Sequence, residues 1–275
     1  MQQVKQEILR LGVVNFLNAT PLIDGIETTQ GINLIQKVPS ELVGCLERDE
    51  VDFALASSID YQKSNKDFAI LPVGVLSSDG ATLTVRLCSR IPFEKIAEVY
   101  CDIDSHTSIA LLQIVLYKTY GIRPKIISCD VKSLDNNNLK WPDTVLLIGD
   151  KVVTSSAETK YPIQLDLGEA WSSQTGLPFV FAMWFGNASL SNDLVNRAFI
   201  ILDRQRRCNA TRLEQVVSEN AQSRGWDVEL AFRYVTEHIQ YAFTESHKKS
   251  LDLFYELSMS LGIIDEVVPL RFHII

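Results

Sequence analysis

The pattern of apolar and polar positions changes once along the chain. From residue 7 to residue 184, short runs rich in β-branched residues alternate with segments whose apolar residues recur every three or four positions. From residue 189 to residue 262, only the helical spacing remains. Alternating strands and helices favour parallel sheets connected by helices. We therefore predict an α/β protein with a helical C-terminal part.

The apolar runs predict strands that are separated by helices or turns. Helices are expected to begin at Thr20, at Pro39 and at Ser105, where a capping residue or a proline precedes apolar residues at helical spacing. Four amphipathic helices are predicted after residue 189. The predicted strands cover residues 8–14, 33–38, 51–56, 68–75, 81–88, 99–101, 126–129, 144–148 and 179–183.

The strand and helix pattern begins afresh after Ile91 and Pro92, which suggests a second α/β unit. We predict a discontinuous first lobe of residues 1–88 and 184–275, and a second lobe of residues 89–183. A chain that leaves one lobe and later returns to it crosses between the lobes twice. Two crossings form a hinge, and a hinge between two lobes implies a cleft.

Neutral hydrogen-bonding side chains collect at the predicted strand ends. Ligands of open sheets bind beyond the carboxyl ends of strands, where helix N-termini direct free N–H groups. Hydroxyl, amide and N–H donors suit a carboxylate or a phosphate. We therefore expect the backbone N–H groups of Thr107 and Ser108 to hold an anion. The candidate cleft residues are Asn18, Ser57, Ser58, Thr84, Arg86, Ser105, His106, Thr107 and Ser108.

Each candidate also has a simpler structural explanation. Asn18 could tolerate a strained turn, and Ser105 could be an ordinary helix cap. His106 is explained equally well as a surface residue or as a ligand contact. Thr84 and Arg86 share one face of a strand by their period-two spacing, so Arg86 either pairs with a carboxylate in the cleft or lies exposed on an edge strand.

Composition and charge narrow the class of protein. The chain has 275 residues, 46% hydrophobic and 22% charged, as expected for a globular protein of about two units. Its 26 Lys and Arg against 34 Asp and Glu give a net charge of −8, which disfavours nucleic acid and anionic membrane surfaces as partners. Five cysteines without a CxxC pair provide neither a zinc knuckle nor a disulfide framework.

Several enzyme classes lack their sequence motifs. The chain has no GxGxxG after the first strand and no GxxxxGK[ST], GxSxG or HExxH. His238, His247 and His273 do not have metal-ligand spacing, so no metal site is predicted. The N-terminal residues show no signal-peptide pattern and no stretch approaches ~20 apolar residues, so we expect a cytoplasmic protein.

Five segments carry a family resemblance. The opening motif VVNFLNATPL at residues 13–22 resembles that of the chorismate dehydratases of the futalosine route to menaquinone. The segments LIGD at 147–150, DLGEAW at 166–171 and TGLPFVFAMW at 175–184 are similar to segments of the same family, as is the helix start at 105–108. The resemblance therefore covers about residues 8–185, whereas the C-terminal helices match only in character.

The resemblance implies a fold, an activity and site residues. The family has the two-lobed type II periplasmic-binding-protein fold, and it converts chorismate to 3-[(1-carboxyvinyl)oxy]benzoate and water without a metal or redox cofactor. By position, the family's functional asparagine corresponds to Asn18, and its functional serine corresponds to Thr84, which keeps the hydroxyl but adds a methyl group. Gly176 and Leu177 are implied as substrate-binding residues. We expect a monomer or homodimer whose substrate supplies its own base, the enolpyruvyl carboxylate.

Two alternatives remain at this point. The sister enzyme that makes 1,4-dihydroxy-6-naphthoate has an opening that looks like Ser-Pro-Cys-Pro-Asn-Asp-Thr, which residues 15–22 do not match. A solute-binding protein that only closes on a small anion would share the fold, because fold does not determine function.

Overall fold

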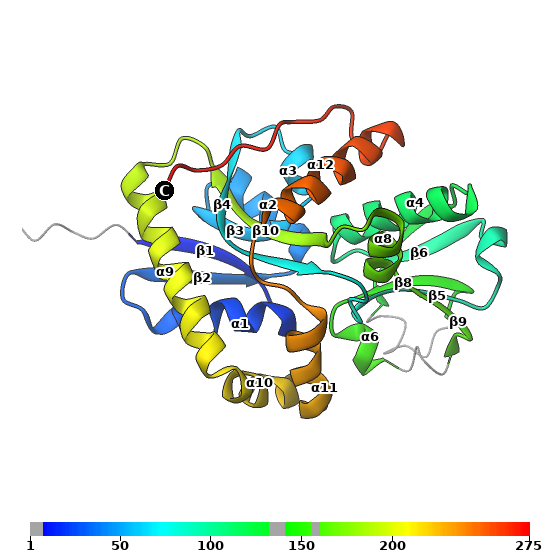
Figure 1. The fold of residues 1–275 in the computed structure, drawn as a ribbon, viewed down its shortest axis with the longest axis horizontal. Helices are drawn as coiled ribbons and strands as arrows, with labels where there is room; N and C mark the ends of the chain where they lie inside the picture. The colour runs from blue at the N-terminus through cyan, green and yellow to red at the C-terminus, as the bar shows by residue number, and fades with distance from the viewer. Residues whose placement is uncertain (1–7, 132–140, 156–159) are drawn as a thin grey trace, which may run out of the picture.

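The computed structural model describes residues 8–131, 141–155 and 160–275, which form two lobes side by side, each with a five-stranded sheet (Figure 1). The first sheet has the order β2-β1-β3-β10-β4 and the second has the order β7-β6-β8-β5-β9. The strands are β1 (Leu9–Val14), β2 (Ile32–Lys37), β3 (Phe53–Ser57), β4 (Phe68–Ser78), β5 (Val85–Ser89), β6 (Glu98–Asp102), β7 (Lys125–Cys129), β8 (Thr144–Ile148), β9 (Ile163–Asp166) and β10 (Phe179–Asn187).

Both sheets are mixed, which corrects the expectation of purely parallel sheets. Strands β1, β2 and β3 pair in parallel, as do β6, β7 and β8. Strand β10 pairs antiparallel with β3 and β4, and β5 pairs antiparallel with β8 and β9. These two antiparallel strands directly follow the two crossings between the lobes, so each enters its sheet from the side of the other lobe. The α/β two-lobed fold class is confirmed.

The crossings lie earlier in the chain than the predicted boundaries. Strand β4 ends at Ser78 in the first sheet, and β5 begins at Val85 in the second. The chain returns between Thr175 and Phe179, where β10 starts in the first sheet. Boundaries at 88/89 and 183/184 therefore separate β5 and half of β10 from their pairing partners. The apolar pattern identifies a strand, but which sheet it joins depends on pairing with distant segments.

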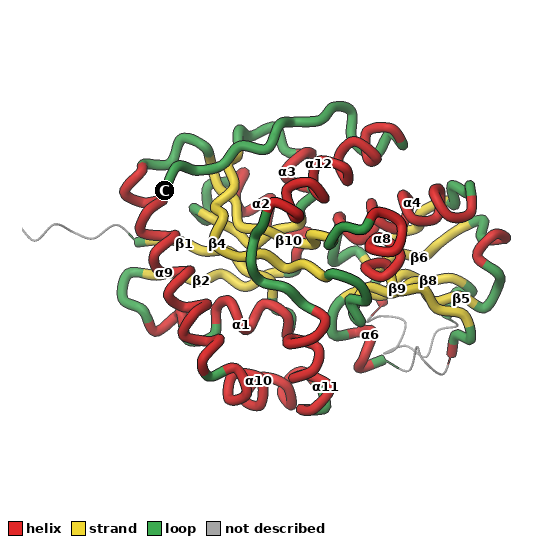
Figure 2. The backbone as a smooth tube through the Cα atoms, viewed as in Figure 1, coloured by secondary structure: helices red, strands yellow, loops and turns green. Residues whose placement is uncertain are grey.

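The helices cover the sheets on both sides (Figure 2). In the C-terminal part, α9 packs on α1 and β4, whereas α12 packs on β10 and reaches α4 of the second lobe. The helices are α1 (Thr20–Ile23), α2 (Pro39–Glu47), α3 (Asp60–Lys63), α4 (His106–Tyr120), α6 (Lys151–Thr154), α8 (Leu167–Thr175), α9 (Asn192–Thr211), α10 (Leu213–Ala221), α11 (Val228–Arg233) and α12 (Glu245–Ser260).

Two of the three predicted helix starts are confirmed as expected. Pro39 begins α2, and the Ser105 hydroxyl caps α4 by accepting a hydrogen bond from the Ser108 N–H at 3.3 Å. Thr20 does not cap its helix, because a short 3-10 turn, η1 (Leu17–Ala19), precedes α1 and places Thr20 inside the helical segment. Strand β9 and helix α8 were not predicted from the sequence.

A glycine in β10 allows a close approach to the start of β3 and the residue before it. A Cβ atom added to Gly186 would overlap the backbone oxygen of Asp52 and lie 2.9 Å from the Phe53 ring. We expect Gly186→Ala to lower the free energy of unfolding by about 1–3 kcal/mol, because neither neighbour can move aside. Urea unfolding measures the effect.

Gly44→Ala is the control, because in α2 the new methyl meets only the flexible end of Arg48 and should be neutral or stabilising. Equal stabilities of the two variants would contradict the prediction.

Candidate active site

A cavity lies between the lobes at the carboxyl ends of β1 and β3. Its enclosed volume is about 40 Å³, and the space including its open mouth is about 480 Å³, so the two lobes lie close together around it. Phe16, Leu76, Ile148 and Phe181 are among its apolar lining residues. Its polar lining consists of neutral groups, and within the described ranges no acidic, basic or histidine side chain contributes to it. These polar residues are Asn18, Ser57, Thr82, Thr84, Ser105 and Ser108.

Asn18 and Ser57 bring hydrogen-bonding atoms into this cavity that have no protein partner. Asn18 lies in η1, directly after β1, and Ser57 is the last residue of β3. Asn18 Oδ1 and Ser57 Oγ are both buried, and neither forms a hydrogen bond within the described part of the chain. Leaving a buried polar atom unpaired costs about 1–3 kcal/mol. Unpaired groups at the wall of a cavity are therefore good candidates for ligand contacts.

The turn explanation for Asn18 does not apply. Among the described non-glycine residues, only Asp49 and Leu83 have a positive φ. Asn18 therefore does not occupy the left-handed conformation that asparagine tolerates better than most residues. The nearby Asn15 has a different role, because its exposed side chain accepts a hydrogen bond from Arg224 at 3.2 Å and does not line the cavity.

The first crossing between the lobes forms a tight turn beside the cavity. The Thr84 N–H donates to the Thr82 carbonyl at 2.8 Å, and Leu83 between them has a φ of 66°. The Asp166 carboxylate holds the turn by accepting from the N–H groups of Thr82 at 2.9 Å and Leu83 at 2.8 Å. A left-handed leucine is costly, and such strain is typical of functional segments.

This turn corrects the prediction that the two side chains two positions apart in the crossing point to the same side. Because β5 begins only at Val85, Thr84 and Arg86 do not share one face of a strand. Thr82 and Thr84 line the cavity, but the Arg86 guanidinium instead contacts the Gln164 side chain at 3.1 Å within the second sheet. The structure therefore does not bring Arg86 to the cavity.

A tyrosine from the C-terminal part completes this wall of the site. The phenol oxygen of Tyr234 lies 2.7 Å from Thr84 Oγ1, and the turn that begins at Tyr234 contacts η1, which carries Asn18. Tyr234 is only 1% exposed, and this burial raises the pKa of its phenol although the hydrogen bond with Thr84 opposes the shift. Its phenol is therefore neutral at physiological pH. No local pattern indicated Tyr234, because it lies 150 residues after Thr84 in a segment where only apolar spacing is visible.

The start of α4 contributes two of its four predicted residues to the cavity. Ser105 and Ser108 line it, but the Ser108 N–H is already taken by the Ser105 cap. The Thr107 hydroxyl accepts from the Ile59 N–H at 3.1 Å and lies 3.4 Å from the Ser58 hydroxyl. Thr107 and Ser58 thus form a contact between the lobes, and neither lines the cavity.

Three further predicted binding residues lie elsewhere. His106 Nδ1 is 2.8 Å from the Asp60 carboxylate, and the His106 side chain is 41% exposed. Gly176 ends α8 with a φ of 66°, and the Leu177 N–H donates to the Thr175 hydroxyl at 3.1 Å. His106 therefore pairs the lobes outside the cavity, whereas Gly176 and Leu177 form the turn before β10.

The lobes also meet at the opening motif. The Phe16 ring packs on the backbone of Gly149, where an added Cβ would lie 3.1 Å from the ring. The Leu17 N–H donates to Asp150 Oδ1 at 3.4 Å, and burial raises the pKa of the Asp150 carboxyl. The described lobes therefore contact each other next to Asn18.

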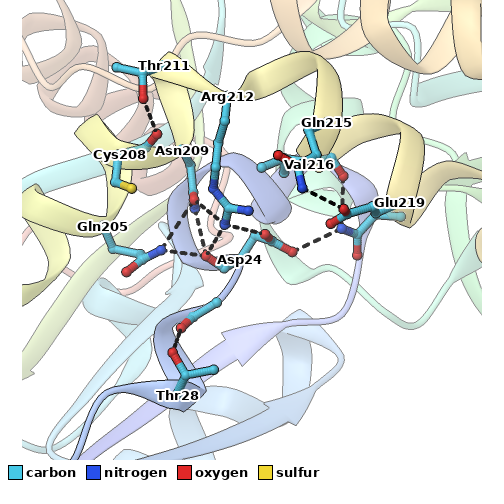
Figure 3. Close-up of polar contacts among 12 residues, drawn as sticks. Asp24, Thr28, Gln205, Cys208, Asn209, Thr211, Arg212, Gln215, Val216 and Glu219 are labelled. Atoms are coloured by element: carbon cyan, nitrogen blue, oxygen red, sulfur yellow. Dashed lines mark hydrogen bonds and ion pairs between the residues drawn. The ribbon is translucent and has the colours of Figure 1, made fainter.

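A polar cluster fixes the segment that follows Asn18 to the C-terminal helices (Figure 3). The Asp24 carboxylate, at the end of α1, pairs with the Arg212 guanidinium at 2.7 Å. The Asp24 carbonyl accepts from the side chains of Gln205 at 2.5 Å and Asn209 at 3.0 Å, both on α9. Partly buried, multiply bonded ion pairs resist displacement better than exposed ones. This cluster therefore helps to hold α1 and the adjoining η1 in place.

No group of three or more His, Cys, Asp or Glu side chains within the described ranges could hold a metal ion. None of the helices in that same part of the chain combines the length and apolar character of a membrane span.

Comparison with known proteins identifies the family and the fold. Chorismate dehydratase of Thermus thermophilus is 30% identical over 189 residues, which cover 63% of this chain and 68% of that protein. A crystal structure of an Archaeoglobus fulgidus protein superposes with a TM-score of 0.77 at 15% identity, covering 94% of this chain and all of that one. The MOPS-bound alkanesulfonate-binding protein of Xanthomonas axonopodis pv. citri gives 0.71 at 13% identity, covering 94% of each chain. These structures show that the fold is of the periplasmic-binding-protein type. Residues 9–259 match the model of the menaquinone biosynthesis family, and the chain belongs to that family.

Proposed function

We propose that this protein is a chorismate dehydratase, which converts chorismate to 3-[(1-carboxyvinyl)oxy]benzoate and water. The family membership and the Thermus relative of that name support an enzyme of menaquinone biosynthesis. The observation that carries the proposal is the pair of unpartnered buried groups, Asn18 Oδ1 and Ser57 Oγ, in a cavity next to Thr84. Asn18 and Thr84 are the positions that correspond to the functional residues of the family.

The cavity can accept a dianion through neutral donors. Hydroxyl groups of Ser57, Thr82, Ser105 and Ser108 line it, and the last two residues lie at the start of α4, where the helix dipole favours negative charge. Fixed neutral dipoles can replace the water around a carboxylate without a buried counter-ion. Such donors would orient both carboxylates of the substrate.

The reaction is an elimination that leaves an aromatic ring. A ring C–H bond breaks, its electron pair forms the new double bond, and the neighbouring hydroxyl departs and takes a proton to become water. Because no Asp, Glu or His of the described ranges lines the cavity, the enolpyruvyl carboxylate of the substrate is the proposed base. Asn18 orients the reacting groups, and the Thr84 hydroxyl stabilises the charge on the departing hydroxyl.

This chemistry makes the protein a carbon–oxygen lyase of the hydro-lyase type. The elimination is redox-neutral, so neither an oxidant nor a reductant takes part. Because the proposed substrate is a biosynthetic intermediate, we place the enzyme in the cytoplasm.

Incubation of the purified protein with chorismate tests the proposal. We expect chorismate to disappear with the appearance of one equivalent of the aromatic enol ether, followed by mass spectrometry and ultraviolet absorbance. Boiled protein is the control, because chorismate also decomposes slowly without catalysis. Saturable binding of chorismate in calorimetry without any product would instead support a small-anion binding protein, which the neutral-donor cavity would also suit.

A further inference from the structure

A hydrogen bond connects Tyr234 and Thr84 at the cavity wall, beside the η1 turn that carries Asn18. Resting on the proposed function, we infer that Tyr234 is a positioning residue: it directs the Thr84 hydroxyl hydrogen toward the substrate. The site would then present a donor of fixed direction to the reacting groups, next to the unpaired Asn18 carbonyl oxygen.

The direction of this hydrogen bond follows from the burial of the phenol. Tyr234 is 1% exposed, and Thr84 Oγ1, 2.7 Å away, is the one partner of its phenol oxygen among the hydrogen bonds of the described residues. A buried phenol hydrogen without an acceptor is costly, so Tyr234 donates to Thr84.

This arrangement leaves the Thr84 hydrogen available. Tyr234 already occupies one acceptor site of the Thr84 oxygen, and Thr84 lines the cavity. The Thr84 O–H can therefore donate to a substrate oxygen that gains negative charge. Asn18 Oδ1 can accept from a substrate hydroxyl.

The surroundings of Tyr234 keep its phenol in one position. The ring stacks on Trp226 with centroids 5.0 Å apart and an interplanar angle of 17°, and Trp226 is 3% exposed. Tyr234 begins a π-helical turn, η5 (Tyr234–His238), and such turns are frequent at functional sites. At the other end of η5, His238 Nδ1 lies 2.8 Å from the Ala81 carbonyl in the first crossing. The turn is thus fixed alongside the segment that carries Thr84.

The hydrogen bond with Tyr234 also explains how a threonine at position 84 can keep its hydroxyl in a defined direction. The added methyl group leaves the aim of the hydroxyl dependent on the Thr84 rotamer. The bond to Tyr234 selects the rotamer whose oxygen faces the phenol. The hydroxyl therefore keeps a defined direction although the side chain is not serine.

Tyr234→Phe tests the inference, because it removes the phenol oxygen and keeps the ring on Trp226. We expect kcat for chorismate to fall about 10- to 100-fold with KM changed less than about threefold, since misdirected groups weaken the transition state more than binding. Tyr61→Phe is the matched control. Tyr61 is 3% exposed and accepts from the Arg271 N–H at 3.0 Å, remote from the cavity lining, so this variant should lose stability without losing kcat.

A double-mutant cycle with Thr84→Val asks whether Tyr234 acts through Thr84. We expect Tyr234→Phe to lower kcat much less in the Thr84→Val background than in the wild type, because the connected hydroxyl is already absent. Equal losses in both backgrounds would show that Tyr234 does not direct Thr84 and would overturn the inference. An unchanged kcat for Tyr234→Phe in the wild-type background would overturn it as well.

The experiment separates this inference from the proposed function. If the wild-type protein does not convert chorismate, the proposed function fails before any variant is compared. If Tyr234→Phe does not fold, 3-fluorotyrosine at position 234 replaces it, because fluorine makes the phenol a stronger donor and a weaker acceptor with little change in shape. A several-fold change in kcat at unchanged melting temperature is then expected, and an unchanged kcat would refute the positioning role.

Discussion

Replacing Asn18 with alanine should lower kcat for chorismate about 10²- to 10³-fold while the free energy of unfolding changes little. The Asn18 carbonyl oxygen faces the cavity without a protein partner, so its loss removes a contact that only the substrate would complete. Loss of one such preorganised group typically costs about 10²–10³ in rate. Steady-state kinetics and urea unfolding measure the two quantities.

Asn15→Ala is the matched control for this prediction. Asn15 lies three residues earlier, carries the same amide and bonds Arg224 outside the cavity, so its variant should keep wild-type kcat. An Asn18→Ala protein that binds chorismate but does not convert it would support a role in the transition state. Unchanged turnover would remove Asn18 from the mechanism.

Thr84→Val should reduce kcat about 10²-fold or more, whereas Thr84→Ser should retain most of it. Valine matches threonine in shape but lacks the hydroxyl that contacts Tyr234 at 2.7 Å and lines the cavity. Loss of the hydroxyl removes a donor to the departing group and leaves the buried phenol without its acceptor. Serine keeps the oxygen, and Tyr234 can still fix its direction.

The comparison of the two Thr84 variants separates the hydroxyl from the methyl group. Full turnover by Thr84→Val would show that the hydroxyl has no part in the reaction. Loss of activity in Thr84→Ser with intact folding would show instead that activity requires the packing of the threonine methyl group. Melting temperatures of both variants identify any loss that is due to unfolding.

Short-range sequence signals made many of the helices and strands predictable. Helix α4 illustrates this: Ser105 caps it, apolar residues recur at helical spacing and Gly121 ends it in the left-handed conformation. Each of these signals acts within a few residues of the element that it predicts. In contrast, β9 and α8 were missed. The cap of α8, Asp166, also bonds the N–H groups of the distant Thr82 and Leu83, and the sequence does not show that second role.

The candidate site was predictable only where a residue type and a strand end coincide. Asn18, Ser57, Ser105 and Ser108 line the cavity because the carboxyl ends of β1, β3 and β6 meet there, and Thr84 joins them from the crossing just before β5. The other predicted residues contact different partners outside the cavity. Side-chain direction depends on the exact backbone turn, and a single left-handed residue at position 83 was enough to invalidate the assumed alternation. The residues outside the cavity are Ser58, Arg86, His106, Thr107, Gly176 and Leu177.

The sequence by itself determined the alternation of strands and helices, the existence of two lobes and the family, and it indicated Asn18 and Thr84 as candidate site residues. These follow from short-range periodicity and from motifs that are contiguous in the chain. Only the tertiary structure decided which sheet each crossing strand joins, which hydroxyls face the cavity and that Tyr234 meets Thr84 from 150 residues away. Such contacts depend on the packing of separate elements, because a side chain acquires a distant partner only after both elements are fixed in space.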